Sequence, residues 1–429
     1  MGSLRRPDRF LPTAPGSRVT RLELFYDLVF VFAFLNVTTV LAEHLSTVAL
    51  LGGLVVLALL WWCWVGFAAL GNYLRADQGV VPLVGAVTVA ALLVLTLSLP
   101  EALVDRPGGA PGPLVFAACY LIIRGLQVFV LVAKSQDRGG SLRRLGLPVV
   151  VSTTLILTAA LPPNPTATPW ATWAKLGLWT CAVGTEFVAG SLRGSGLTVV
   201  SAGHWAERYA LILLIALGES IIALGTGAGL TTNLPLVWPV ITAVILGVAV
   251  IAALWWMYFD SLALGLEQTM HRTRDPGQRF ALARDAYVVL HFVLIAGAIL
   301  FALGLKRYLT TIGEPDRDAW LVRPSDVDDG VLFGGVSVYA AGLLALQWRT
   351  VRRIRPALVV AAVVLGLLVP ATTSLPAVVG LALLTIVCLT LVVTGLRHAD
   401  PFRRQVRETA LDEQLAAEHE QSAWRRRHL

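Results

Sequence analysis

The sequence predicts an all-α, polytopic integral membrane protein with about twelve transmembrane helices. Of its 429 residues, 56% are apolar and only 14% are charged, and the mean hydropathy is +0.72. Soluble proteins carry about 25% charged residues. The apolar residues lie in blocks of about 15 to 25, the length that a helix needs to cross a bilayer. This pattern excludes a soluble multidomain enzyme, a disordered chain and a disulfide scaffold.

Twelve such blocks follow one another along the chain. Acidic residues mark the start of the first block, and the second and eighth blocks end in clusters of Trp. The eleventh and twelfth are short, and Pro370 and Pro376 separate them, which is typical of a tight hairpin. The predicted spans are 24–41, 48–70, 80–99, 114–133, 145–161, 171–190, 208–226, 236–259, 285–304, 331–348, 357–370 and 376–396.

Two features of the chain separate it from secreted proteins. The first block contains Asp27 and is not followed by a small-residue cleavage site, so we interpret it as a retained helix rather than a signal peptide. The four cysteines all fall inside apolar blocks and are far apart in sequence, so we expect buried thiols without a metal or redox role. They are Cys63, Cys119, Cys181 and Cys388.

Lys and Arg are distributed unequally between the two sides of this map. If the N-terminus is cytoplasmic, the cytoplasmic segments hold 27 of the 34 basic residues and the outer loops hold 5. The other two, Arg124 and Lys175, lie within spans. The positive-inside rule therefore predicts that both termini are cytoplasmic. It also accounts for the net charge of +7, so we predict no nucleic-acid partner.

The span map divides the chain into two halves of six helices, joined by a cytoplasmic linker. Trp clusters end both the second and the eighth spans, as two parallel six-helix repeats would predict. Trp also gathers at the interfaces of any membrane protein, so the repeat is left open. A charged tail follows, long enough for one short surface helix. The segments are 1–22, the basic N-terminus; 23–190, the first half; 191–207, the linker; 208–396, the second half; and 397–429, the tail.

Ionisable residues inside spans indicate the candidate polar site, because each costs about 2.5–3.5 kcal/mol to insert. In the first span, Glu23, Asp27 and Thr38 share one helix face. Two acids on one face repel each other unless a cation lies nearby. Either an Arg from another helix or a transported cation would meet this need. Glu23 also suits an interaction with the helix N-terminus and Arg21.

The seventh span carries a second group of polar residues. His204, Glu207 and Arg208 share one face at its start, and Glu219 follows eleven residues after Arg208, about 16 Å deeper. Ser220 is next to Glu219 and indicates close helix packing. Arg124 in the fourth span and Lys175 in the sixth are candidate partners of Glu219, and if Arg124 or Arg208 reaches Glu219, the pair is structural. We favour the other case, in which Arg208 reaches the cytoplasmic interface and Glu219 is free to exchange a proton.

The remaining polar residues indicate no enzyme and no cofactor. His291 is interpreted as a buried packing residue, Asp260 and Glu267 as residues of the cytoplasmic interface, and Glu186 as a minor candidate. The acidic outer loop 305–330 lacks the ligand spacing of an EF-hand. No zinc-type cluster, haem ligand pair, phosphate-binding glycine loop or nucleophile elbow is present. We therefore predict no catalytic residues, no metal and no cofactor.

Three short segments carry a family resemblance. Arg21–Phe30, Glu207–Tyr209 and Gly218–Ser220 resemble motifs of the bacterial low temperature requirement protein A family, although Tyr209 stands where that family usually has Phe. The resemblance runs from about residue 18 to residue 396. It implies a multi-pass protein of the bacterial inner (plasma) membrane. The family name records a growth phenotype and implies no transport activity or substrate.

A second resemblance favours a different function. Arg21, Phe25 and Asp27 match an Arg-x-x-x-Phe-Ser-Asp signature of twelve-span potassium channels built as two six-span repeats. Tyr26 replaces the Ser of that signature, and the seventh span lacks a second copy.

Three functions follow from these observations. The leading one is a secondary transporter or permease, proton-coupled through Asp27 and Glu219. The alternatives are a passive cation channel of the potassium type and a non-transporting stress-response or scaffold protein. The predicted partners are the lipid bilayer and an unknown small solute or ion, and a homo-oligomer is left open. The candidate site residues are Glu23, Asp27, Thr38, Arg124, His204, Glu207, Arg208, Glu219 and Ser220.

Overall fold

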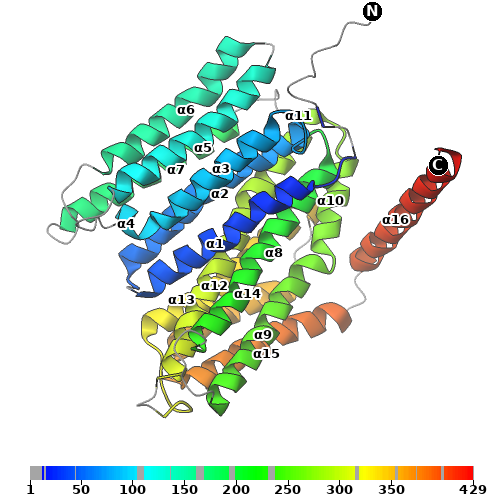
Figure 1. Cartoon of the computed structure of the whole chain (residues 1–429). Helices are drawn as coiled ribbons and strands as arrows, with labels where there is room; N and C mark the ends of the chain where they lie inside the picture. The colour runs from blue at the N-terminus through cyan, green and yellow to red at the C-terminus, as the bar shows by residue number, and fades with distance from the viewer. Residues whose placement is uncertain are drawn as a thin grey trace, which may run out of the picture.

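The computed structural model shows a bundle of long helices (Figure 1). Over the part of the chain that it describes, it contains no β-strand, and an isolated bridge joins Pro12 to Leu74. The described residues are 12–13, 16–43, 45–103, 111–135, 137–160, 169–192, 199–229, 237–314, 318–352, 356–372, 374–397 and 401–428. The all-α class predicted from the sequence is confirmed.

Every predicted span coincides with a helix. The helices are α1 (Arg21–Glu43), α2 (Thr47–Tyr73), α3 (Val81–Leu97), α4 (Leu99–Leu103), α5 (Gly112–Lys134), α6 (Arg138–Thr158), α7 (Pro169–Leu192), α8 (Ala202–Gly227), α9 (Trp238–Phe259), α10 (Leu262–Arg272), α11 (Pro276–Leu282), the π-helix η1 (Ala283–Leu290), α12 (His291–Ile312), α13 (Asp326–Val351), α14 (Pro356–Thr372), α15 (Ala377–Arg397) and α16 (Pro401–His428).

Not every helix has the length and apolarity of a membrane span. Among the described residues, nine helical segments are long and apolar enough to cross a membrane, and α3 and α14 are apolar but shorter. The helix α7 falls in neither group. The protein is therefore a multi-pass α-helical membrane protein, and the count of twelve crossings stays a prediction.

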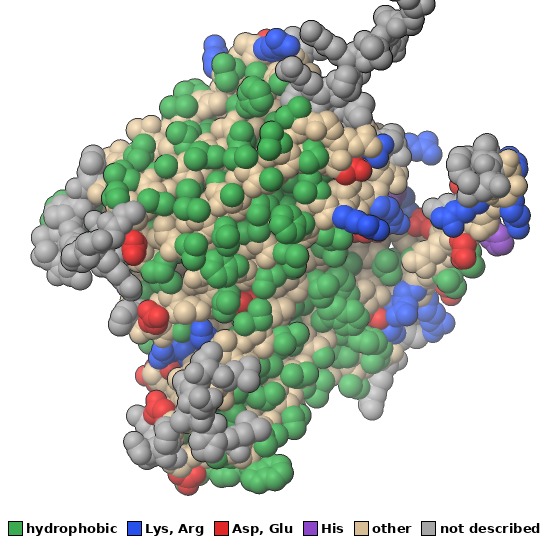
Figure 2. Space-filling view, viewed as in Figure 1, with side chains coloured by type: hydrophobic (Ala, Val, Ile, Leu, Met, Phe, Trp, Pro, Cys, Tyr) green, Lys and Arg blue, Asp and Glu red, His purple; other side chains and the backbone are tan. Residues whose placement is uncertain are grey.

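Apolar side chains cover the outside of the bundle. Figure 2 shows them spread over the visible face, with charged side chains gathered toward the ends of the helices. Large residues on several different helices point outward, among them Leu83, Phe129, Ile245, Leu367 and Ile386, each at least 60% exposed. Exposed apolar side chains on this scale are unfavourable in water and suit the hydrocarbon core of a bilayer.

Several predicted span limits differ from the observed helix limits, and at the starts of α6 and α8 helix capping is the reason. The helix α8 begins at Ala202 rather than near 208, because the Ser201 hydroxyl accepts a hydrogen bond from the His204 backbone N–H. The helix α6 begins at Arg138 rather than near 145, because Asp137 caps it in the same way. Each cap extends its helix beyond the predicted span, so that polar residues lie in the first turns of the helix.

The helices α1 and α8 lie side by side and run in the same direction, and α12 packs against both (Figure 1). We call the end of the bundle where α1 and α8 begin the basic side. The end where they finish, next to residues 318–325, is called the acidic side. The Arg307 side chain of α12 donates to the Ala42 carbonyl of α1, which brings the ends of these two helices together on the acidic side.

The cysteine prediction is partly wrong. Cys63, Cys119 and Cys388 are buried, but Cys181 is exposed on α7. A thiol within an apolar block can face lipid as well as the core, so membership of a block does not establish burial.

The charged tail forms a longer helix than expected. The helix α16 has 28 residues. Asp260 accepts hydrogen bonds from both Arg403 and Arg407, which ties the start of α16 to the end of α9. Gln268 of α10 donates to the Val406 carbonyl and fixes the same part of α16.

Candidate functional site

Three side-chain bridges join α1 to α8, and all three share one register. His204 contacts Glu23, Arg208 contacts Asp27 and Thr38 contacts Glu219, and the partners differ by 181 positions in each case. A constant offset means that the two helices are parallel and stay adjacent along their length. We call this row of bridges the α1–α8 seam. It brings together Glu23, Asp27 and Thr38, the three residues predicted to share one face of the first span.

The first bridge lies at the basic side. The His204 Nε2 and Glu23 Oε1 atoms are 2.8 Å apart, and the second Glu23 oxygen accepts hydrogen bonds from the backbone and hydroxyl of Thr20. Gly71 of α2 lies against this carboxylate, where a Cβ atom would collide with it. Asn72 holds the other side of the His204 ring, with its Nδ2 3.3 Å from Nδ1. Glu23 is therefore fixed by side chains and is more than a helix-start acid.

A cleft opens onto this first bridge from the basic side. Its volume is about 300 Å³. The residues that line it include Glu23, His204, Arg18, Arg75 and Asp77. Glu23 and His204 are at most 1% exposed, so this polar cleft ends against the buried first bridge.

The second bridge is an ion pair buried from solvent. Arg208 Nη1 donates to Asp27 Oδ2 at 3.0 Å and to the Glu23 carbonyl at 2.9 Å, while Trp64 Nε1 donates to the other Asp27 oxygen at 2.8 Å. The guanidinium also lies over the rings of Trp64 and Phe67. Arg208 is 0% exposed. The expectation that it reaches the cytoplasmic interface is therefore wrong, because Asp27 supplies a counter-charge within the bundle.

The third bridge leaves one carboxylate oxygen free. Thr38 Oγ1 donates to Glu219 Oε1 at 2.6 Å. Within the described part of the chain, Glu219 Oε2 and the Ser220 hydroxyl are buried without a hydrogen-bond partner. No described cation lies within 4.0 Å of the Glu219 carboxylate, although Lys306 interacts with it electrostatically from farther away. Glu219 therefore differs from Asp27, whose two oxygens are both occupied.

Apolar side chains separate the second bridge from the third. Phe30 and Phe34 of α1 and Ile212 and Ala216 of α8 are all buried between them. The eleven residues from Arg208 to Glu219 correspond to about 16 Å along the helix. The basic-side cleft therefore does not continue to Glu219 in this conformation.

Arg124, the fourth-span candidate, belongs to another cluster. It donates to both oxygens of Glu186 on α7, at 3.3 and 3.0 Å. The same carboxylate accepts hydrogen bonds from Tyr120, Ser152 and Trp62. The hypothesis that Arg124 pairs with Glu219 is therefore wrong. The Arg124–Glu186 pair is well satisfied and joins α5, α6, α7 and α2.

Glu207 lies outside the seam. It is half-buried, accepts a hydrogen bond from the Val19 backbone N–H and lies 3.9 Å from Arg18. His204 and Arg208 point into the bundle from the same helix turn, so the predicted common face of the three residues is not present. Glu207 instead holds the segment before α1 against α8.

His291 is a buried packing residue, as predicted. Its Nε2 lies 2.7 Å from the Tyr258 hydroxyl, and its Nδ1 lies 2.8 Å from the Ala286 carbonyl. The ring also stacks on Tyr287. Ala286 lies within the π-helix η1, so the imidazole satisfies a carbonyl in this irregular turn.

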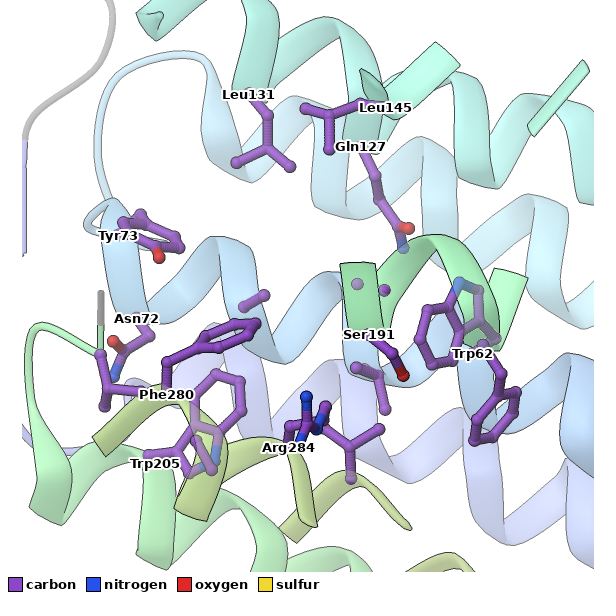
Figure 3. Close-up of a pocket in the computed structure, with 18 of the residues that line it drawn as sticks. Trp62, Asn72, Tyr73, Gln127, Leu131, Leu145, Ser191, Trp205, Phe280 and Arg284 are labelled. Atoms are coloured by element: carbon purple, nitrogen blue, oxygen red, sulfur yellow. The ribbon is translucent and has the colours of Figure 1, made fainter. Parts of the chain in front are cut away.

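A second cavity lies between the two halves of the chain (Figure 3). Its volume is about 110 Å³, and most of its lining is apolar. In Figure 3, Trp62 and Gln127 face Phe280, Trp205 and Arg284 across the cavity. Gln127 is already engaged, because it donates to the Cys63 carbonyl and accepts from Arg124. The cavity therefore suits an apolar group better than a polar solute.

The sequence did not identify two residues that complete the seam. Trp64 was noted only as part of a Trp cluster, but its indole N–H holds Asp27. Lys306 was assigned to an outer loop, but it lies within α12 and donates to Thr39 at 2.9 Å. The sequence signal for Lys306 was its position directly after a long apolar block, where the helix could continue. Among the described residues, no three His, Cys, Asp or Glu side chains form a metal-binding group.

Comparison with known proteins agrees with this architecture. The profile of the bacterial low temperature requirement A protein (LtrA) family matches residues 18–393. The chain is also similar to the uncharacterized protein RA0937 of Rhizobium meliloti (strain 1021), with 25% identity over 301 residues, which cover 66% of this chain and 67% of that protein. No solved structure matches the chain. With the family match spanning α1 to α15, the chain belongs to the bacterial low temperature requirement A family.

Proposed function

We propose that this protein is a secondary transporter or permease for a small cation, with proton coupling at Glu219. The observation that carries the proposal is the free Glu219 oxygen, buried at 0% exposure without a cation within ion-pair distance among the described residues. A carboxyl group in such a place costs free energy unless it binds a proton or a cation. That is the property that a coupling site needs.

Two other buried acids, Asp27 and Glu186, do not have this property, whereas Asp329 near the start of α13 also has one buried oxygen without a partner while its other oxygen accepts from Tyr308. Asp27 is held by Arg208 and Trp64, and Glu186 is held by Arg124 and three further donors. A carboxylate whose two oxygens are both occupied by protein donors has no free position for a proton or a transported cation, and losing one partner leaves a buried charge uncompensated. The sequence alone predicts proton coupling through Asp27 and Glu219 together. We now assign it to Glu219 alone. Asp27 has a structural role.

The seam also supports a route for the solute. The basic-side cleft ends at Glu23 and His204, on the same two helices that carry Glu219. We propose that the basic side is cytoplasmic and that the membrane is the bacterial plasma membrane, in agreement with the distribution of Arg. A passive cation channel would need an open polar path, and the buried Phe30 and Phe34 oppose it. A scaffold would not need an unpaired buried acid.

Flux through the purified protein tests this proposal. In proteoliposomes, we expect a sodium or potassium gradient to drive proton movement, recorded with an internal pH dye. Glu219→Gln should abolish that movement, because the amide can no longer bind or release the proton.

The matched control is Glu207→Gln, which makes the same chemical change on the same helix. Because Glu207 is half-buried and lies outside the seam, this variant should keep wild-type flux. Voltage-driven current that ignores the proton gradient would instead support the channel. Absence of any flux in the wild-type protein would support the scaffold.

A further inference from the structure

Lys306 is placed as a movable cation near two acids. Its Nζ donates to Thr39 Oγ1 at 2.9 Å, and Thr39 is next to Thr38, the residue that binds Glu219. The ammonium is within electrostatic range of both the buried Glu219 and the exposed Glu43. Lys306 is half-buried and lies near the acidic side.

The backbone of Lys306 cannot move freely, but its side chain can. Gly227 of α8 packs against the Lys306 backbone, where a Cβ atom would come within 2.7 Å of the carbonyl oxygen. This contact fixes α12 against α8 just beyond Glu219. The lysine stem has four carbons and rotates about each bond. The ammonium can therefore move while its helix stays in place.

The neighbouring Arg307 could not serve the same purpose. It is paired with Asp328 and donates to the Ala42 carbonyl at 2.7 Å, so its guanidinium is already held by two elements. Arg208 is likewise bound to Asp27. Within the described residues, Lys306 is therefore the cation near Glu219 that makes no ion pair within 4.0 Å.

We propose that Lys306 is a tethered counter-cation that gates Glu219 from the acidic side. With a proton or a transported cation on Glu219, the ammonium stays on Thr39, as in this structure. When Glu219 gives up its ligand, the ammonium moves onto the free carboxylate oxygen. The site therefore never holds an unpaired charge, and a second cation cannot enter until the ammonium withdraws. This inference rests on the proposed function and specifies when a cation can reach Glu219.

The test compares coupled flux with leak in proteoliposomes. We expect Lys306→Gln to lose most of its sodium- or potassium-driven proton movement. Its passive leak of the same cation should rise about tenfold or more, because a neighbouring positive charge raises the electrostatic barrier for a second cation. The control is Arg323→Gln, which removes an exposed positive charge on the same side of the bundle and should change neither quantity. An equal leak in both variants would overturn the proposal.

Chemical restoration of the charge keeps the test independent of folding. In a Cys181→Ser background, Lys306→Cys should leak, and aminoethyl methanethiosulfonate, which adds a primary ammonium to the thiol, should restore coupling. Methyl methanethiosulfonate adds no charge and should not restore it. Equal effects of the two reagents would overturn the proposal.

Failure of this inference can be distinguished from failure of the proposed function. Coupled wild-type flux that survives in Lys306→Gln would overturn the gate and leave Glu219 as the coupling site. A wild-type protein without flux would overturn the transporter and the gate together.

Discussion

Among single residues, Asp27 shows that the role of a buried acid depends on the groups that bind it. In sequence it resembles Glu219, since both carboxylates lie in apolar spans. In the structure the Asp27 oxygens are occupied by Arg208 and Trp64, and both members of the ion pair are buried. Removing one partner of such a pair leaves the other charge without compensation, which costs more than the pair itself contributes. The pair is therefore sensitive to single substitutions.

We expect Asp27→Asn to lower the free energy of unfolding by about 3–5 kcal/mol, because Arg208 would be left as an uncompensated buried cation. The double variant Asp27→Leu with Arg208→Met should recover most of this loss, since it removes both charges. Denaturant unfolding in detergent micelles would measure both variants. Full stability of Asp27→Asn would show that the pair does not hold α1 to α8.

The site was partly predictable at this scale. The helical spacing of Glu23, Asp27 and Thr38 placed them on one face, and all three contact α8. Arg208 was misplaced because the start of its helix was set too late, which put its side chain at the interface. The pairing of Arg124 with Glu186 could not be predicted, since a single sequence does not say which helices are neighbours.

Among the helices, α12 and α13 pack with their backbones in contact. A Cβ atom on Gly297 would come within 2.6 Å of the Tyr339 backbone nitrogen, and one on Gly304 would come within 2.6 Å of the Leu332 Cα. Gly335 of α13 faces the α12 backbone at Phe301 in the same way. Small residues of this kind allow close helix packing inside a membrane. They hold α12, and therefore Lys306, in a defined position.

Two adjacent glycines of α13 offer a matched test of this packing. Gly335→Ala should lower stability by about 1–3 kcal/mol, because the new methyl group meets backbone atoms that cannot move aside. Gly334 has open space around it, so Gly334→Ala should be neutral or slightly stabilising. Thermal unfolding of the two variants in one detergent would compare them. Equal melting temperatures would contradict the close contact.

The existence of the helices was predictable, but their boundaries were not. Long apolar blocks identify spans because a bilayer requires them. The caps at Ser201 and Asp137 each depend on a single hydrogen bond. For the π-helix, the His291 Nδ1 lies 2.8 Å from the Ala286 carbonyl and its Nε2 lies 2.7 Å from the Tyr258 hydroxyl of α9, a contact between helices that the sequence does not reveal.

For the whole molecule, the distribution of charge predicts the orientation. Most Lys and Arg residues belong to the segments assigned to the basic side, although Arg208 must be moved from that group into the core. Moving one residue changes little, because 27 basic residues were counted in the cytoplasmic segments and 5 in the outer loops. The predicted orientation is therefore unchanged.

We expect a Cys at position 323 to react with a membrane-impermeant maleimide in intact cells. A Cys at position 138 should react only after the cells are permeabilised. Both side chains are exposed, Arg138 at the start of α6 and Arg323 before α13, so accessibility does not differ between them. Labelling in a Cys181→Ser background would measure both. The reverse pattern would mean that the orientation is inverted.

The shared register of the α1–α8 seam limits how this protein can change shape. An axial shift of α1 past α8 by one helical turn would bring Glu219 beside Phe34 or Ala42, neither of which has a polar side-chain atom to offer it. All three bridges would break in the same step, with no substitute bridge for Glu219. The two helices must therefore travel as one rigid unit, and any alternation of access has to come from other helices sliding or tilting around that fixed pair.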